Sequence, residues 1–313
     1  MSAPLPTCLL NGAFMPLEQA RVSPLDRGFL FADAVYEVVP VYGGRPFRLR
    51  EHLQRLDRSL DAIRMAPVMT HQAWAELLVG LISRNSAHDA SLYLQVTRGA
   101  EQGRNHAWPP GLTPTIFAYC TELPPMPAAL LESGVAAVTA EDIRWARRDI
   151  KSTALLGNIL LKKLAADAGA FETIMLENGE LTEGSSTTVH VIKHGVICTP
   201  PNGRRILPGT TRDVVTQLAD RLGLSTASMP ISEAELRGAD EIWLAFATRG
   251  LLPVTTLDGE PVGAARAAGA PPFAGRTAGG PPFAGRPSPG PYFVRVYQAF
   301  QDYIAELAGT PPL

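Results

Sequence analysis

The sequence predicts a two-domain protein, with an α+β first half and a second half of strands, hairpins and helices. Its 313 residues are enough for two separate hydrophobic cores. The first half groups its elements as hairpin, strands, two helices and strands, which differs from strict βαβ alternation. A stretch with three prolines, TELPPMPAALLES, then changes the character of the chain. We therefore expect an N-terminal domain over 1–120, a linker over 121–133 and a C-terminal domain over 134–313.

Turn residues and hydrophobic periodicity define the elements of the first half. Asn11-Gly12 predicts a two-residue hairpin, and Gly43-Gly44 turns a β-rich run over 35–42 back into a short strand. Leucines at helical spacing predict a helix in EHLQRLDRSLDAIRM, and a second helix is expected from His71 to about Asn85. Two further strands, SLYLQVTRG and TPTIFAYC, flank a loop that contains Gly103, Arg104, Asn105 and His106.

The second half opens with a strand, VAAVTA, and a basic cluster that runs into a helix. Either Ser152 or Thr153 is a candidate cap for this helix. Its apolar residues recur at helical spacing and predict one buried face. These residues are Leu155, Leu156, Ile159, Leu160 and Leu164.

Three hairpins, two helices and a strand are expected after that helix. Asn178-Gly179 is a strong hairpin signal, and a His194-Gly195 turn and the segment VTTLDGEPV indicate two more hairpins. A helix follows Pro208-Gly209, a strand EIWLAFAT ends at Thr248, and a C-terminal helix carries an apolar stripe. That stripe consists of Phe293, Val296, Tyr297, Phe300, Ile304 and Leu307.

Residues 263–291 interrupt this pattern with a tandem repeat, GAPPFAGRTA followed by GGPPFAGRPS. Two copies are too few for a solenoid, and a segment rich in Gly, Ala and Pro cannot supply a core. We expect a surface insertion that arose by local duplication, with a lid or partner contact through Phe273 and Phe283 as the alternative.

Composition and charge exclude several classes of partner. A formal net charge of −2 gives no reason to expect nucleic acid or an anionic membrane. Three widely spaced cysteines without a CxxC pair argue against a disulfide framework or a zinc site and fit a reducing cytoplasm. We identify neither a signal peptide nor an apolar run of the roughly 20 residues that a membrane span needs.

Lys151 and Glu183 are the first candidates for chemistry, because both lie at the ends of predicted elements, where catalytic groups are commonly mounted. Arg144, Arg147 and Arg148 precede Lys151, and an apolar helix follows it. A lysine that forms Schiff bases needs nearby cations or partial desolvation, so this surrounding suits it. Taken alone, however, each residue is better interpreted as a solvated side chain at the surface.

Several motifs in a fixed order favour a functional role for both residues. The block RWARRDIKS is followed by a helix, by GAFETI and by LTEGSS. Upstream stand DRGFLFADAVYEVV and EHLQRL, and downstream stands ILPGTTR. This arrangement resembles the class IV aminotransferases, which are fold-type IV enzymes that use pyridoxal 5'-phosphate. The resemblance covers almost the whole chain except the repeat, and it is greatest to the D-amino-acid aminotransferases.

The resemblance implies a fold and a cofactor site. The fold would combine a small N-terminal α+β domain with a larger C-terminal domain that has a mixed, barrel-like β-sheet and helices. Lys151 would bond covalently to the cofactor and act as the acid/base, and Glu183 would pair with its ring nitrogen. The remaining implied contacts are Arg55, Thr210, Thr211 and Thr248 with the phosphate, and Tyr36 and Arg144 along the wall of the site.

The same resemblance implies the substrate. Arg104 and His106 would bind the α-carboxylate of a D-amino acid, in a transamination with a 2-oxo acid. Transfer from branched-chain L-amino acids and an aminodeoxychorismate lyase remain alternatives, and a non-catalytic binding protein on the same scaffold is disfavoured by Lys151 and Glu183. The family also implies a homodimer. The sequence departs from the family pattern at Ala32 and Ala34, where glycine is expected, and at Ala247, where a hydroxyl is expected.

Overall fold

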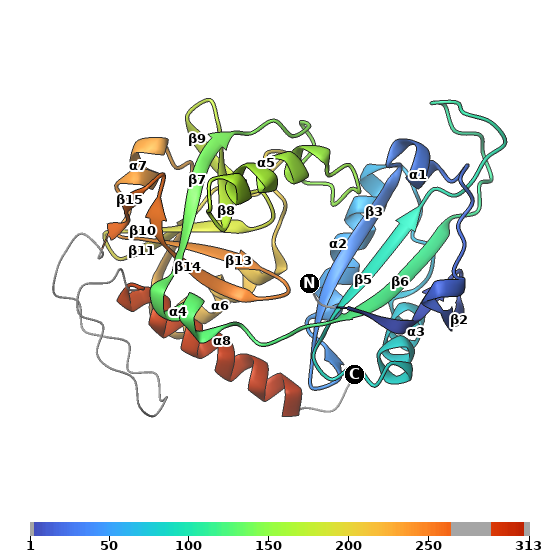
Figure 1. Ribbon diagram of the computed structural model, residues 1–313, viewed down its shortest axis with the longest axis horizontal. Coiled ribbons are helices and arrows are strands. Elements are labelled where there is room, and N and C mark those ends of the chain that lie inside the picture. The colour runs from blue at the N-terminus through green and yellow to red at the C-terminus, as the bar shows by residue number, and fades with distance from the viewer. Residues whose placement is uncertain (1–2, 264–288, 310–313) are drawn as a thin grey trace. The chain divides into compact units, whose positions relative to one another are not determined.

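A computed structural model describes residues 3–263 and 289–309, and the chain divides into two compact units (Figure 1). The first unit comprises Met1–Pro124, Ile150–Leu155 and Ile304–Leu313, and the second comprises Pro125–Asp149 and Leu156–Tyr303. Lys151 therefore belongs to the first unit, although residues of the second precede and follow it. Both copies of the predicted repeat, with the alternative contact through Phe273 and Phe283, lie outside the described residues.

The first unit is built on a six-stranded antiparallel sheet with the order β2-β1-β6-β5-β3-β4 (Figure 1). Its first hairpin forms as predicted, because Asn11 and Gly12 both adopt the positive φ, 50° and 85°, that a tight β-hairpin turn requires. The strands are β1 (Pro4–Leu10), β2 (Ala13–Pro16), β3 (Ala34–Tyr42), β4 (Arg45–Pro46), β5 (Ala90–Thr97) and β6 (Thr115–Glu122).

Helices α2 (Leu49–Ala62) and α3 (His71–Arg84) form one core with this sheet. The Thr70 hydroxyl caps α3 by accepting a hydrogen bond from Ala73 N at 3.2 Å. The short helices η1 (Leu17–Gln19) and α1 (Arg27–Phe31) precede β3. The leucines whose spacing predicted α2, Leu53, Leu56 and Leu60, lie in this core, together with side chains of α3: Trp74, Leu78, Leu81 and Ile82.

The second unit contains a nine-stranded mixed sheet with the order β12-β11-β10-β13-β14-β7-β8-β9, and β15 pairs with β14. The pairs β11–β12, β14–β7 and β7–β8 are parallel, and the other pairs are antiparallel. The strands are β7 (Val135–Glu141), β8 (Glu172–Glu177), β9 (Glu180–Gly184), β10 (Thr188–Lys193), β11 (Val196–Thr199), β12 (Ser225–Ser228), β13 (Glu241–Phe246), β14 (Gly250–Leu257) and β15 (Glu260–Pro261).

The second unit includes two helices that the sequence did not predict, α4 (Ala128–Ser133) and α7 (Glu233–Arg237). Helix α4 lies within the stretch expected to be a linker. The others are α5 (Leu156–Asp167), α6 (Thr210–Arg221) and α8 (Pro291–Gly309). Among the described residues, none of these helices is long and apolar enough to cross a membrane.

Helix α5 differs from its prediction in two ways. It begins at Leu156 rather than at Ser152 or Thr153, because the backbone of those two residues bonds to the first unit's β3: Ser152 forms a β-bridge with Val35, and Thr153 N donates to Ala34 O. The predicted buried face is also wrong. Its side chains at Leu156, Ile159, Leu160 and Leu164 are 70%, 61%, 53% and 43% exposed, and the helix is instead buried at Leu161 and Ala165.

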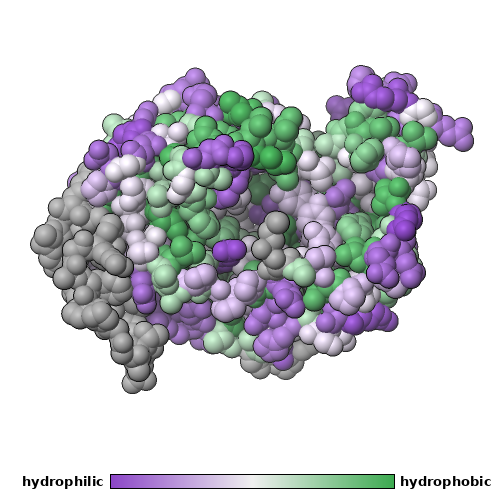
Figure 2. Space-filling view, in the orientation of Figure 1, coloured by the Kyte–Doolittle hydropathy of each residue, from purple (hydrophilic) through white to green (hydrophobic). Residues whose placement is uncertain are grey.

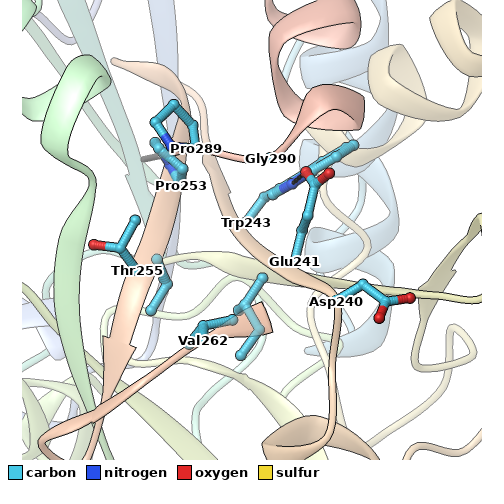
Figure 3. Close-up of a pocket in the computed structure, with 10 residues that line it drawn as sticks. Asp240, Glu241, Trp243, Pro253, Thr255, Val262, Pro289 and Gly290 are labelled. Carbon is cyan, nitrogen blue, oxygen red and sulfur yellow. Dashed lines mark hydrogen bonds between the residues drawn. The ribbon is translucent and has the colours of Figure 1, made fainter. Parts of the chain in front are cut away.

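The start of α8 is held by a buried carboxylate on β13. Glu241 accepts hydrogen bonds from Tyr292 N, from Phe293 N and from the Trp243 indole, each at 2.9 Å. Figure 3 shows Glu241 directed towards the beginning of α8, beside Trp243 and Gly290. A negative charge at a helix N-terminus is stabilised by the unpaired N–H groups there. Glu241 therefore fixes where the C-terminal helix starts.

Candidate active site

Lys151 occupies a short extended segment beside β3 in the first unit. Its carbonyl accepts a hydrogen bond from Tyr36 N at 2.9 Å, and its N–H donates to Ser59 Oγ at 3.2 Å. The side chain is half-buried, and Nζ lies 4.4 Å from the centre of the Tyr36 ring. The main chain of Lys151 is thus fixed by β3 and α2, and its amine faces an aromatic ring that favours a cation.

Arg55 lies in a buried cluster next to this segment. Its Nε and Nη2 donate to the two carboxylate oxygens of Glu37, each at 2.8 Å, and His52 Nδ1 lies 2.7 Å from Glu37 Oε2. All three side chains are at most 3% exposed. The Arg55 and His52 contacts hold the pKa of Glu37 well below its usual range, against the effect of burial. Glu37 orients Arg55 as a planar, charged donor, and the predicted phosphate contact of Arg55 stays a prediction.

Arg104 and His106 lie on the loop between β5 and β6, and both are exposed. They gather around one ring: the Arg104 guanidinium carbon lies 4.9 Å from the centre of Phe31, and the His106 ring lies 5.4 Å from it. The structure thus brings together the two residues predicted to bind a substrate carboxylate. Phe31 is the last residue of α1, and Ala32 after it adopts a positive φ of 54°, a conformation in which glycine would be less strained.

Glu183 ends β9 in the second unit and is 5% exposed. Arg144 Nη1 donates to its Oε1 at 2.5 Å, and Leu207 N lies 3.2 Å from both of its oxygens. Burial raises the pKa of Glu183, while the charge of Arg144 and these hydrogen bonds oppose the rise. A buried carboxylate with one arginine partner is suited to share a hydrogen bond with a basic heterocyclic nitrogen.

Asp142 supports this pair and was not singled out from the sequence. Its carboxylate accepts from Arg144 Nε at 3.0 Å and Nη2 at 2.7 Å, and from the Thr182 hydroxyl at 2.8 Å. The Arg144 guanidinium is therefore held in one plane by Asp142 on one side and by Glu183 on the other. Such fork geometry makes arginine hard to replace by lysine.

Glu172 is a second carboxylate that the sequence analysis passed over. It is fully buried at the start of β8 and accepts hydrogen bonds from the hydroxyls of Ser185 and Ser186, which follow directly after Glu183-Gly184. Asn158 of α5 adds a bond to Ser185 O at 2.8 Å. The turn that ends β9, and with it the backbone of Glu183, is fixed by these contacts.

Thr210 and Thr211 form the first turn of α6, and both are buried. Gly209 occupies the N-cap position, and no side-chain oxygen caps the helix there. A Cβ at Gly209 would lie 2.7 Å from Thr188 Oγ1, so another residue at this position would have to displace the Thr188 side chain. A helix start with this character is suited to an anion, because its N–H groups and dipole point outward. Thr248 lies in the turn between β13 and β14 and is half-buried.

Within each unit, the structure brings together residues that the sequence predicted to share a site. The first unit groups Lys151 with Tyr36, and Arg104 with His106, and the second pairs Arg144 with Glu183. In the described part of the chain, no group of three or more His, Cys, Asp or Glu side chains is placed to hold a metal ion. The cofactor contacts predicted for Lys151, Glu183 and the start of α6 stay predictions.

Comparison with known proteins assigns this fold to a family. The family model for class IV aminotransferases matches residues 34–257, so the chain belongs to that family and is an aminotransferase. It is 40% identical over 256 residues to a D-alanine aminotransferase from Bacillus licheniformis, covering 82% of this chain and 90% of that protein. It is 38% identical over 256 residues to a D-alanine aminotransferase from Listeria monocytogenes, covering 81% of this chain and 88% of that protein.

Solved structures agree on the fold. A branched-chain amino acid aminotransferase from Escherichia coli superposes with a TM-score of 0.84 at 26% identity, covering 96% of this chain and 95% of that one. A fold IV transaminase from Curtobacterium pusillum gives a TM-score of 0.70 at 26% identity, covering 80% of this chain and 88% of that one. The fold-type IV architecture expected from the sequence is therefore confirmed.

Proposed function

We propose that this aminotransferase uses pyridoxal 5'-phosphate to move an amino group between a D-amino acid, such as D-alanine or D-glutamate, and a 2-oxo acid. The observation that carries the proposal is the identity of about 40% to D-alanine aminotransferases over four fifths of the chain. The solved branched-chain enzymes share the fold at lower identities, 22% to 26%. Arg104 and His106 around Phe31 add two donors suited to a carboxylate.

The residues present fit the cofactor group by group. Lys151 supplies an amine for the aldehyde, Glu183 a buried carboxylate for the ring nitrogen, and the uncapped start of α6 supplies donors for the phosphate. The bound cofactor would supply an electron sink that stabilises negative charge at the substrate α-carbon. We assign the phosphate to Thr210 and Thr211, and further to Arg55 and Thr248.

The chain's own groups then perform the proton chemistry. When its amine is not bonded to the cofactor, Lys151 Nζ would be the general acid/base that removes and returns a proton at the substrate α-carbon. Glu183 would pair with the protonated ring nitrogen of the cofactor, and the charge of Arg144, which Asp142 orients, favours the ionised form of Glu183 against the effect of burial. The Tyr36 ring packs against the Lys151 amine. Arg104 and His106 would bind the α-carboxylate of the substrate.

A donor panel tests the substrate class. D-Alanine, L-leucine and aminodeoxychorismate are compared as donors in one assay with the purified protein. We expect kcat/KM for D-alanine to exceed that for L-leucine by at least about tenfold, which corresponds to about 1.4 kcal/mol in the barrier. Brisk turnover of L-leucine without D-alanine turnover would assign the chain to the branched-chain enzymes, and pyruvate release from aminodeoxychorismate would assign it to the lyases.

We further propose that the protein is a homodimer in the cytoplasm. Figure 2 shows hydrophobic residues gathered over α5, and four of its aliphatic side chains are more than 40% exposed. The nearby Ile143 and Trp145 are 56% and 45% exposed. Contiguous apolar surface of this kind marks an interaction site, and a second copy is the partner that the family implies. All three cysteines are free and buried, which fits a reducing compartment.

The dimer has its own test. Ile159→Glu places a charge in the exposed apolar face of α5, where burial against a second copy would be costly. We expect sedimentation velocity to give a dimer for the wild type and a monomer for this variant. Met229→Glu, which charges a 40% exposed apolar side chain outside α5, is the matched control and should remain dimeric. A monomeric wild type would contradict the proposal.

A further inference from the structure

We propose that Arg27 is a positioning residue for the substrate carboxylate, because it holds the backbone of the loop that carries Arg104 and His106. This inference rests on the proposed function, in which those two side chains bind the carboxylate. Arg27 itself is 3% exposed and lies at the start of α1. It touches the loop through its guanidinium group and is too deeply buried to meet a substrate directly.

The contacts are made to main-chain carbonyls. Arg27 Nη1 donates to Asn105 O at 2.6 Å, and Nη2 donates to His106 O at 3.1 Å. Among the described residues, the only other hydrogen bond within 103–107 is local, from Ala107 N to Asn105 Oδ1 at 3.2 Å. The loop therefore depends on Arg27 for its place, since an exposed loop without regular backbone bonds is otherwise free to move.

Arg27 can act as an anchor because it is itself tightly bound. Its Nε donates to Asp33 at 2.9 Å, and its Nη1 is paired with Glu101. The main chain is fixed as well, since Arg27 N donates to Gly99 O at 2.9 Å. Because two carboxylates neutralise the Arg27 guanidinium, Arg27 fixes the position of the loop without adding net positive charge to it. The positive charge that would attract a carboxylate is that of Arg104.

Phe31 links Arg27 to the side chains of Arg104 and His106. It lies one helical turn after Arg27, and the Arg27 guanidinium carbon is 4.8 Å from its ring centre. Arg104 and His106 pack against the same ring at 4.9 Å and 5.4 Å. Arg27 thus fixes both the backbone of the loop and the ring that its two functional side chains share.

Two variants and a matched control test the proposal in the holoenzyme. Arg27→Met removes the donors, and Arg27→Lys keeps a charge that cannot donate to both carbonyls in a planar fork. Arg98→Met is the control, because Arg98 is 6% exposed and binds the same Asp33 but donates to Ile63 O and Arg64 O. Its contact with the loop is the Trp108 ring, 4.0 Å away, and it bonds to no residue of 103–107. KM and kcat for D-alanine, bound cofactor by visible absorbance and melting temperature are measured for each.

We expect Arg27→Met to raise KM for D-alanine at least about tenfold, with kcat changed less and cofactor content unchanged. Arg27→Lys should lie between it and the wild type, while Arg98→Met should keep KM within about twofold even if its melting temperature falls. A wild-type KM in both Arg27 variants, or an equal rise in Arg98→Met, overturns the inference. If the wild type uses L-leucine instead, the proposed function fails, and the same comparison made with that carboxylate donor still decides the role of Arg27.

Discussion

Replacing Lys151 with alanine is expected to lower transamination turnover by at least about 10³-fold, because it removes the amine that we assign to both covalent bonding and proton transfer. The loss should occur without unfolding. Both hydrogen bonds that fix this residue, from Tyr36 N to its carbonyl and from its own N–H to Ser59 Oγ, belong to its main chain and survive the substitution. Turnover with D-alanine and the visible absorbance of the protein-bound cofactor are the measurements.

The controls separate the chemistry from charge and folding. Lys163→Ala removes an exposed lysine from α5 and should keep wild-type turnover. Adding a small primary amine to Lys151→Ala should restore part of the rate, since it replaces the missing base in solution. If Lys151→Ala retains full activity, the assignment of this residue is wrong, whatever the substrate class proves to be.

Turn chemistry was the part of the fold that the sequence predicted best. Asn178, Gly179, His194 and Gly195 all adopt positive φ, and each pair joins two antiparallel strands as expected. These turns are local, so two adjacent residues are enough to specify them. The sheet orders depend on contacts distant in sequence, and the parallel pairs β14–β7 and β7–β8 were not predicted from the residues.

Helix α5 shows why periodicity alone was not enough. Its leucines and isoleucine do line one face, but periodicity identifies an apolar stripe without saying what covers it. In the single chain that stripe is exposed, and the smaller contact through Leu161 and Ala165 is the one that is buried. The prediction of a buried face was therefore wrong for this chain taken alone, and the proposed second copy would cover the stripe.

The site residues were easier to find than the residues that hold them. Lys151 and Glu183 stood out by their motifs, whereas Asp142, Glu172 and Glu37 bond to residues on other elements of the fold. The Thr182 partner of Asp142 is 40 residues away, and the Arg55 partner of Glu37 is 18 residues away. A usable signal did exist for two of them. Glu37 and Glu172 interrupt the apolar runs VYEVV and FETIM, and a carboxylate in a buried strand must have a charged or hydrogen-bonding partner.

Unlike these buried carboxylates, His190 on β10 is a buried polar side chain without hydrogen-bond partners among the described residues. It is 1% exposed, and neither ring nitrogen has a hydrogen-bond partner among the described residues, although the ring packs 6.1 Å from that of Trp243. Burial, with a smaller contribution from the charge of Arg212, lowers the pKa of His190 to about 3. The unfolded chain binds a proton on this histidine below about pH 6.5, while the folded ring stays neutral until about pH 3. Stability is therefore lost as the pH falls through this window.

His190→Phe should raise the free energy of unfolding by about 1–2 kcal/mol at pH 7.5, because it removes two unsatisfied polar atoms and keeps a ring against Trp243. This stability gain of the variant over the wild type should increase as the pH falls, because the variant has no histidine proton to lose on folding. Relative to its value at pH 7, the gain should be larger by about 2 kcal/mol at pH 5 and by about 4 kcal/mol at pH 3. Urea unfolding at several pH values measures both effects, and His190→Leu guards against overpacking by the larger ring. His88→Gln, at a histidine whose side chain is 80% exposed, should change the free energy of unfolding by less than about 0.5 kcal/mol at every pH. A stability gain that does not depend on pH would show that packing, rather than the desolvated imidazole, is what limits the wild type at this position.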